Sequence, residues 1–266
     1  MLHYMNHYER AGHLIRAAEV EDVDKIYALQ VEAFGKTSLP FTIYQSPKTV
    51  KYLRKLVNEQ GDTSSNHFFV AEQRGQIAGY YHAVSRYDRF FLNYIAVSLE
   101  ARGQGLGNAL LAHFEDLGAR FGHSKLALDV FSDNARVKEW YLAQGYQAIS
   151  SCFHALISLN LLPYSRSSLS WDEDAWQRAL KDEEEWGFSK LQGYSGSGEL
   201  SIGLIGGSRC KLLEHKMMSV EAAVEAVASR LALHRAVLIL SGLENVSEQW
   251  PILKQNQAFQ LVKGTK

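Results

Sequence analysis

The chain has 266 residues, of which 46% are hydrophobic and 21% charged, and its formal net charge is −1; it can bury a substantial core in one large or two small domains. It shows no basic stripe of the kind that binds nucleic acid, and its two cysteines, Cys152 and Cys210, lack metal-binding or redox spacing. No apolar run is long enough to span a membrane, and the first residues lack a secretory signal, so we expect a cytoplasmic protein without a metal.

Hydrophobic periodicity divides the first part of the chain into short strands and amphipathic helices. Arg74 and Gly75 separate two alternating segments and predict a tight hairpin turn. In chain order, the predicted elements are a strand at 14–17, a helix at 22–34, a polar break at 35–47, a helix to about 59, strands at 67–72, 76–84 and 89–97, and a helix from 109.

The connection between the strand at 89–97 and the next helix is rich in glycine. It contains Arg102, Gly103, Gln104, Gly105, Leu106 and Gly107. Glycine lets backbone N–H groups close on phosphate oxygens, the following helix adds its unpaired first-turn N–H groups, and arginine suits phosphate. The alternatives are a tight turn without a ligand and a dinucleotide fingerprint, which would need glycine where Asn108 or Leu110 stands.

A second pattern follows this loop and its helix. A strand predicted at 125–131 carries Val130, and Asn134 then opens a helix that contains Tyr141. Gly145 is placed to end that helix, and Tyr146 starts the next strand.

These two patterns resemble the two signatures of the GNAT superfamily of N-acetyltransferases. The first is Arg/Gln-x-x-Gly-x-Gly, met by Arg102, Gly105 and Gly107; the second is a strand valine, an asparagine, a helix tyrosine and a Gly-aromatic pair. Residues 15–34 also look like the first strand and helix of the superfamily, whereas Val137 replaces a commoner alanine. The resemblance implies an α/β (α+β) GNAT fold, with a mixed central sheet flanked by helices, and an enzyme that moves an acyl group from acetyl-CoA to an amine.

The resemblance also implies roles for individual residues. Tyr141 would be the general acid for the leaving thiolate, and its alternative role is ring packing on the sheet. Phe41 and Tyr44 would line the substrate pocket, or else pack against the sheet. The backbone of residues 95–97 would pair with the pantetheine arm, the loop would hold the pyrophosphate, and Asn134 would bond the cofactor arm or cap its helix. The expected cofactor-binding residues are Ile95, Ala96, Val97, Arg102, Gly103, Gln104, Gly105, Leu106, Gly107 and Asn134.

The general base and the acceptor stay open at this point. Superfamily members often use a glutamate on the strand before the loop, but residues 89–94 contain no carboxylate. The alternatives are Asp88, His82, Glu32 and a chain of water molecules. We expect a small-molecule or peptide amine acceptor, no nucleic acid or membrane partner, and a monomer or homodimer. The other functions to weigh are a non-catalytic acyl-CoA sensor or interaction protein and a scaffold of two inert copies.

The second part of the chain repeats the plan of the first. Residues 119–130 match residues 229–240 in pattern, and at the same shift the phosphate loop maps onto residues 212–217, which contain Glu214 and no glycine. We therefore expect a tandem fold with a degenerate, non-catalytic second copy; the alternative is an unrelated small α/β domain. The expected domains are 1–160 and 171–266, joined by a serine-rich linker at 161–170. The second part is expected to have helices at 171–186, 219–231 and 245–255, and strands at 199–206, 211–215, 235–240 and 259–263.

Overall fold

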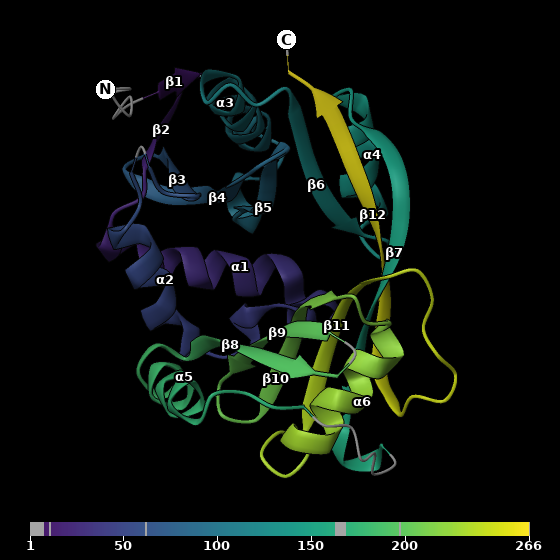
Figure 1. Cartoon of the computed structure of the whole chain (residues 1–266). Coiled ribbons are helices and arrows are strands. Elements are labelled where there is room, and N and C mark those ends of the chain that lie inside the picture. Colours follow the sequence, from purple (N-terminus) through teal and green to yellow (C-terminus); the bar gives the residue numbers. More distant parts are fainter. Residues whose placement is uncertain (1–7, 11, 62, 163–168, 197, 266) are drawn as a thin grey trace. The chain divides into compact units, whose positions relative to one another are not determined.

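The computed structural model describes residues 8–10, 12–61, 63–162, 169–196 and 198–265 (Figure 1). By its internal contacts the chain divides into two compact units. Unit 1 comprises residues 1–39, 53–151 and 259–266, and unit 2 comprises residues 40–52 and 152–258. The expected domain boundary stays a prediction, because residues 163–168 of the linker lie outside the described part and the units follow contacts rather than one cut in the sequence.

Unit 1 is built on a mixed sheet. Its strands follow the spatial order β1-β2-β3-β4-β5-β6-β12-β7. Neighbours from β1 to β5 are antiparallel, whereas β5 and β6 are parallel. The strands are β1 (Tyr8–Arg10), β2 (His13–Ala17), β3 (Asn66–Gln73), β4 (Gln76–Arg86), β5 (Arg89–Val97) and β6 (Lys125–Phe131), with β7 (Gln147–Ser158) and β12 (Ile252–Gly264) contributing residues to both units.

Helices cover both faces of this sheet (Figure 1). Two consecutive residues of β4 show the arrangement: the Tyr80 hydroxyl donates to Gln30 of α1, and the Tyr81 hydroxyl lies 2.7 Å from His113 Nδ1 of α3. Because successive side chains of a strand point to opposite faces, α1 and α3 lie on opposite faces. The helices with residues in unit 1 are α1 (Val23–Ser38), α2 (Thr49–Asn58), α3 (Leu106–Arg120) and α4 (Ala135–Ala143).

Helix α3 packs closely on the sheet. Leu106, Leu110 and Phe114 recur at helical spacing and are almost completely buried. Near the end of the helix, a Cβ on Gly118 would lie 2.7 Å from Leu126 Cδ2, so only glycine permits this approach. This packing fixes the axis of α3 and therefore the position of its N-terminus, where the glycine-rich loop ends.

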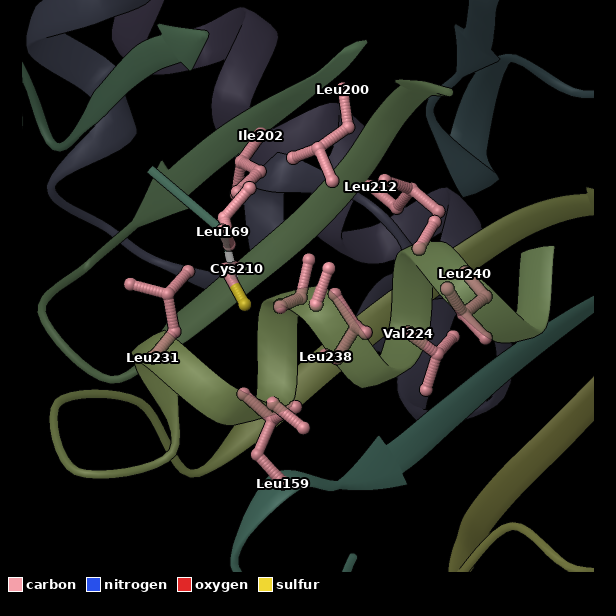
Figure 2. Packing of buried hydrophobic residues seen from close by; sticks show 14 of the residues in the cluster. Leu159, Leu169, Leu200, Ile202, Cys210, Leu212, Val224, Leu231, Leu238 and Leu240 are labelled. Carbon is pink, nitrogen blue, oxygen red and sulfur yellow. The ribbon is translucent and has the colours of Figure 1, made fainter. Parts of the chain in front are cut away.

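Unit 2 is also built on a mixed sheet, and its helices α5 and α6 both contribute to one core cluster. Its strands follow the order β12-β7-β11-β10-β9-β8; β10 and β11 are parallel, and β7–β11, β9–β10 and β8–β9 are antiparallel. Figure 2 shows Val224 and Leu231 of α6 packing with Cys210 of β10 and Leu238 of β11 in one apolar core. The remaining elements are α5 (Glu173–Trp186), α6 (Val220–Leu231), β8 (Phe188–Ser195), β9 (Gly198–Ile205), β10 (Arg209–Lys216) and β11 (Val237–Leu243).

The structure confirms a mixed sheet flanked by helices, and it corrects two local predictions in unit 2. The expected helix at 245–255 is wrong: residues 245–251 form turns and irregular backbone, and Ile252 begins β12. Pro251 lacks an N–H and disfavours helix at the residue before it, so it opposes a helix here. Strand β8 was not predicted, because its polar residues weaken the alternating pattern.

Candidate functional site

The site is built where β5 separates from β6. The two strands pair at Phe90↔Leu126, Phe91↔Ala127 and Leu92↔Leu128, and their pairing ends there. On its other edge β5 stays paired with β4 as far as Val97. The backbone edge of residues 94–97 that faces away from β4 therefore has no strand partner within the described residues, although it keeps a strand conformation. An extended ligand can add to such an edge as a further strand.

The loop after this strand has the backbone form that its glycines require. Gly103 has φ 76° and Gly105 has φ 84°, and Gly105 is the N-cap of α3. A Cβ added at Gly103 would meet no atom within 4 Å, so the surroundings of this position are open. The unpaired first-turn N–H groups of α3 thus end at an open loop, which is a favourable place for an anion.

Several hydrogen bonds hold the loop in this form. Gln104 O lies 3.1 Å from His13 Nε2 of β2, and Gln104 Oε1 accepts from Gln73 Nε2 of β3 at 2.8 Å. The Gln104 Nε2 group donates to Glu100 O, and Arg102 Nε donates to Val97 O at 3.2 Å. The side chain of Gln104 is therefore used inside the protein to shape the loop.

Asn134 and Tyr141 lie at the two ends of α4. Asn134 is the N-cap residue, but its side chain makes no capping hydrogen bond in the described structure. Tyr141 is 4% exposed, and its ring lies 4.6 Å from that of Trp140 and 5.7 Å from that of Tyr146. Burial raises the pKa of the Tyr141 phenol, so the hydroxyl keeps its proton at neutral pH.

Trp140 connects α4 to the glycine-rich loop, a link that sequence reasoning missed. Its Nε1 donates to Asn108 Oδ1 at 2.7 Å, and its ring lies 3.7 Å from the position of a Cβ on Gly107. The first turn of α3 and the helix that carries Tyr141 are thereby held together. The one sequence signal for this link was that Trp140 directly precedes Tyr141.

A group of three aromatic rings marks the place where the strands part. Phe34 of α1 lies 5.8 Å from the ring of Tyr94 on β5 and 6.2 Å from that of Phe131 on β6. Gly35 (φ 51°) interrupts α1 directly after Phe34. Sequence reasoning missed all three rings, because no local pattern shows that the end of α1 meets the ends of two strands. They form an apolar wall beside the exposed edge of β5.

Phe41 and Tyr44 belong to unit 2. Both side chains are buried, at 2% and 0% exposed, and the Phe41 ring lies 6.1 Å from that of His154. Such burial agrees with the packing alternative for these residues. Their role in acceptor binding stays a prediction.

The three candidate bases lie in different surroundings. Asp88 is paired with Arg89 at 2.5 Å, and this hydrogen bond lowers the pKa of the carboxyl group. Glu32 is exposed, and its Oε1 accepts from the backbone N–H of Leu99, just before the loop, at 2.9 Å. His82 is 4% exposed, and burial lowers its pKa to about 3. Of the three, Glu32 is the one bonded to the turn between β5 and the loop.

Comparison with known proteins gives a family for this part of the chain. The model of the acetyltransferase (GNAT) family matches residues 23–146. No curated protein sequence matches the chain. None of the helices in the described part of the chain is long and apolar enough to cross a membrane.

Solved structures match almost the whole chain. A tandem GNAT protein from the clavulanic acid biosynthesis pathway, solved without acetyl-CoA, is 11% identical, with a TM-score of 0.67 over 96% of this chain and 99% of its own. A GCN5-related N-acetyltransferase from Sphaerobacter thermophilus is 14% identical, with a TM-score of 0.63 over 96% of both chains. At these identities the likeness concerns the fold, and it confirms the predicted tandem arrangement.

Proposed function

We propose that the chain transfers an acetyl group from acetyl-CoA to an amine by direct attack on the thioester; the match of the acetyltransferase (GNAT) family model to residues 23–146 supports this proposal. The observation that carries this proposal is one continuous stretch. The unpaired edge of β5 runs into a loop with two positive-φ glycines, and that loop ends at the N-terminus of α3.

The residues present fit coenzyme A as a co-substrate. The loop from Arg102 to Gly107 offers backbone N–H groups, a helix N-terminus and a guanidinium group for the diphosphate. The open edge at Ile95, Ala96 and Val97 offers N–H and C=O groups for the amides of the pantetheine arm. Asn134, whose side chain makes no capping bond, is available to the same arm.

The chemistry needs an acid on the thioester side. As the amine nitrogen bonds to the carbonyl carbon and the C–S bond breaks, the sulfur takes the electron pair and must gain a proton. Tyr141 supplies this proton: its phenol is protonated at neutral pH, and an apolar site would disfavour the free thiolate that otherwise forms. The amine loses a proton to Glu32 or to water, and a proton then returns to the Tyr141 oxygen.

Unit 2 would serve a role other than catalysis. Its strand β10 and helix α6 are joined by only three residues, Met217, Met218 and Ser219, and none of them is glycine. We therefore propose that residues 1–160 hold the catalytic domain, and that residues 171–266 form a degenerate copy that does not bind the diphosphate.

Calorimetry with acetyl-CoA tests the binding half of this proposal. We expect a dissociation constant on the order of 1–100 μM, in the range common for enzyme substrates. Absence of binding at millimolar acetyl-CoA would refute it.

An acceptor screen that follows the release of free thiol tests the catalytic half. Binding without turnover, together with slow acetyl-CoA hydrolysis that Tyr141→Phe leaves unchanged, would favour a non-catalytic acyl-CoA sensor. We expect instead that at least one primary amine accelerates thiol release and that Tyr141→Phe suppresses it.

A further inference from the structure

We propose that His82 is a positioning residue: through Asn93 it holds the irregular segment of β5 that presents its backbone to the acetyl thioester. This inference rests on the proposed function. It assigns His82 a task different from that of a general base, and it adds Asn66 and Asn93 to the residues on which the site depends.

The first observation is a β-bulge in β5. Leu92 pairs with Ala83, and Tyr94 pairs with His82, so Asn93 is an extra residue without a partner across the ladder. A bulge bends its strand and re-aims the residues that come after it. Here it falls one residue after the last pair with β6, and directly before the unpaired edge at residues 94–97.

The second observation is a chain of hydrogen bonds across three strands. Asn93 Nδ2 lies 3.1 Å from His82 Nδ1, and His82 Nε2 lies 3.0 Å from Asn66 Oδ1. An amide nitrogen can only donate, so Nδ1 accepts and Nε2 must carry the proton that it donates to Asn66. Both ring nitrogens are thus used, and His82 is held in a single tautomer.

The third observation is that the imidazole is firmly packed. His82 is 4% exposed, and its ring stacks on Phe68 with centroids 3.9 Å apart and an angle of 7° between the planes. Burial, followed by the neighbouring His67, lowers the pKa of His82 to about 3. The imidazole therefore stays neutral at neutral pH, and it could take a proton from an amine only by giving up its bond to Asn93.

These observations assign the ring a mechanical task. If the extra residue were instead taken into the ladder, the register after it would shift by one residue, and the following side chains would turn to the other face. The His82 bond fixes the extra residue at Asn93. The backbone N–H groups after the bulge then keep one direction, as stabilisation of a developing oxyanion requires.

The affinity of the full chain for acetyl-CoA relative to coenzyme A reports this function directly, because the two ligands differ only in the acetyl thioester. We expect the natural chain to bind acetyl-CoA about fivefold more tightly, as one additional hydrogen bond to the carbonyl would give. His82→Phe keeps the ring stack but removes both hydrogen bonds. It should reduce the ratio to about one; affinity for coenzyme A should fall as well, because residues 95–97 also hold the pantetheine arm, so the ratio of the two affinities is the readout.

Two further variants separate positioning from general damage. His82→Gln retains one acceptor and one donor, and it should recover at least half of the preference for acetyl-CoA. His67→Phe changes another buried histidine, on β3, and should lower stability without changing the ratio. If His82→Phe does not fold, Asn93→Ala removes the same hydrogen bond by changing its other partner, and it should reduce the affinity ratio in the same way.

The outcomes distinguish the two proposals. A natural chain that binds neither ligand would refute the proposed function. A natural chain that binds both equally, or a His82→Phe chain that keeps the full preference for acetyl-CoA, would refute the role of His82 and leave the proposed function standing.

Discussion

Both units open their sheets in the same way. In unit 1, the parallel strands β5 and β6 share three pairs, the last at Leu92↔Leu128. In unit 2, β10 and β11 also share three, the last at Lys211↔Ile239. In each unit the first of these strands then shifts register against its antiparallel neighbour, at Asn93 in β5 and between Leu212 and Glu214 in β10. The opening itself is therefore a property of the repeated fold.

The units differ in the connection from the opened strand to the next helix. In unit 1, eight residues, 98–105, connect β5 to α3, and they include two glycines with positive φ. In unit 2, three residues connect β10 to α6, and Met217 adopts a φ of 61° without being glycine. A short connection without glycine offers fewer backbone N–H groups to an anion. The difference teaches that the loop, rather than the parted strands, distinguishes the proposed cofactor site from the corresponding place in unit 2.

The opening of unit 2 still contains a cavity of about 380 Å³. Leu212, Leu240 and Leu243 line its apolar part, and Glu214 and Lys216 also contribute to its wall. The carboxylate of Glu214 offsets the charge of Lys216, so the two together offer a diphosphate no net positive charge. The cavity is therefore unsuited to the part of coenzyme A that the loop of unit 1 would hold.

Substituting Gly105 by glutamate should have the largest effect on the affinity of unit 1 for acetyl-CoA. The added carboxylate would lie in the loop, repel the diphosphate and strain a backbone held at φ 84°. We expect affinity for acetyl-CoA to fall by about 1,000-fold, corresponding to ~4 kcal/mol. Calorimetry on the full chain measures this loss.

Gly122→Glu is the matched control for that variant. Gly122 has φ 76°, and a Cβ there would meet no atom within 4 Å, so the substitution introduces similar backbone strain beyond the other end of α3. It should leave affinity for acetyl-CoA within about twofold, because it adds no charge to the loop. Equal losses in both variants would mean that strain, rather than the anion site, explains the effect.

The two units should also respond differently to acid. Burial lowers the pKa of His67 and His113 to about 4 and that of His82 to about 3 in unit 1, whereas His154 in unit 2 has a pKa of about 4. Folded pKa values below the unfolded value near 6.5 mean that the unfolded chain gains protons first as pH falls. Stability from these groups is therefore present above pH ~6.5 and is lost as pH falls toward 4.

Unit 1 has these three deeply buried histidines and also His123, whose pKa burial lowers, so it should lose more stability. We take about half of the change in the free energy of unfolding that these pKa shifts imply. Because of its two additional deeply buried histidines, unit 1 should then lose ~3 kcal/mol more of this free energy than unit 2 between pH 7 and pH 4.5. Hydrogen exchange followed by mass spectrometry measures each unit separately. Equal loss of protection in the two units would contradict the histidine assignment.

The loop and the helix that build the site were predictable from local sequence, but the side-chain contacts that line it were not. The loop and α4 follow from short patterns around Gly105 and Tyr141, because glycine and helix-cap signals act over a few residues. The contacts of Phe34 with Tyr94 and Phe131 join three separate elements, and no spacing in the chain encodes them. The bulge at Asn93 could not be predicted either, because it depends on the register of β5 against β4.

The second copy shows a further limit of pattern matching. The shift between the two halves mapped the phosphate loop onto residues 212–217, whereas the structure places Leu212–Lys216 inside β10. The connection of unit 2 is shorter than that of unit 1, so a constant shift cannot align both the strands and the helices. The expectation that the connection of the second copy contains no glycine nevertheless holds for residues 217–219, which form the actual connection.

Tyr141→Phe should separate catalysis from binding in unit 1. Removing the hydroxyl takes away the proposed acid, for which a loss of about 100-fold in turnover is typical. Affinity for acetyl-CoA should change less than about twofold, because the ring keeps its packing beside Trp140. Steady-state thiol release and calorimetry on the same variant supply the two values.

Tyr146→Phe serves as the control for Tyr141→Phe. Tyr146 is 2% exposed, and its ring lies 5.7 Å from that of Tyr141. Removing its hydroxyl perturbs the same cluster without removing the proposed acid. Comparable losses of turnover in the two variants would assign Tyr141 to packing.

The smallest expected effect comes from removing one cation of unit 1, and its control removes one cation of unit 2. Arg102 lies after β5 and donates its Nε to Val97 O, whereas Lys216 is the last residue of β10. Arg102→Ala removes the one full positive charge from the loop, and we expect acetyl-CoA to bind about tenfold more weakly, a loss of ~1.4 kcal/mol. Lys216→Ala removes a comparable charge from the strand end just before the shorter connection and should change affinity less than about twofold. Calorimetry at low and at high salt completes the test, because a genuine contact with the diphosphate makes the Arg102 effect shrink as salt rises. If Lys216→Ala weakened binding as much as Arg102→Ala, unit 2 would have kept an anion site that its short connection does not explain.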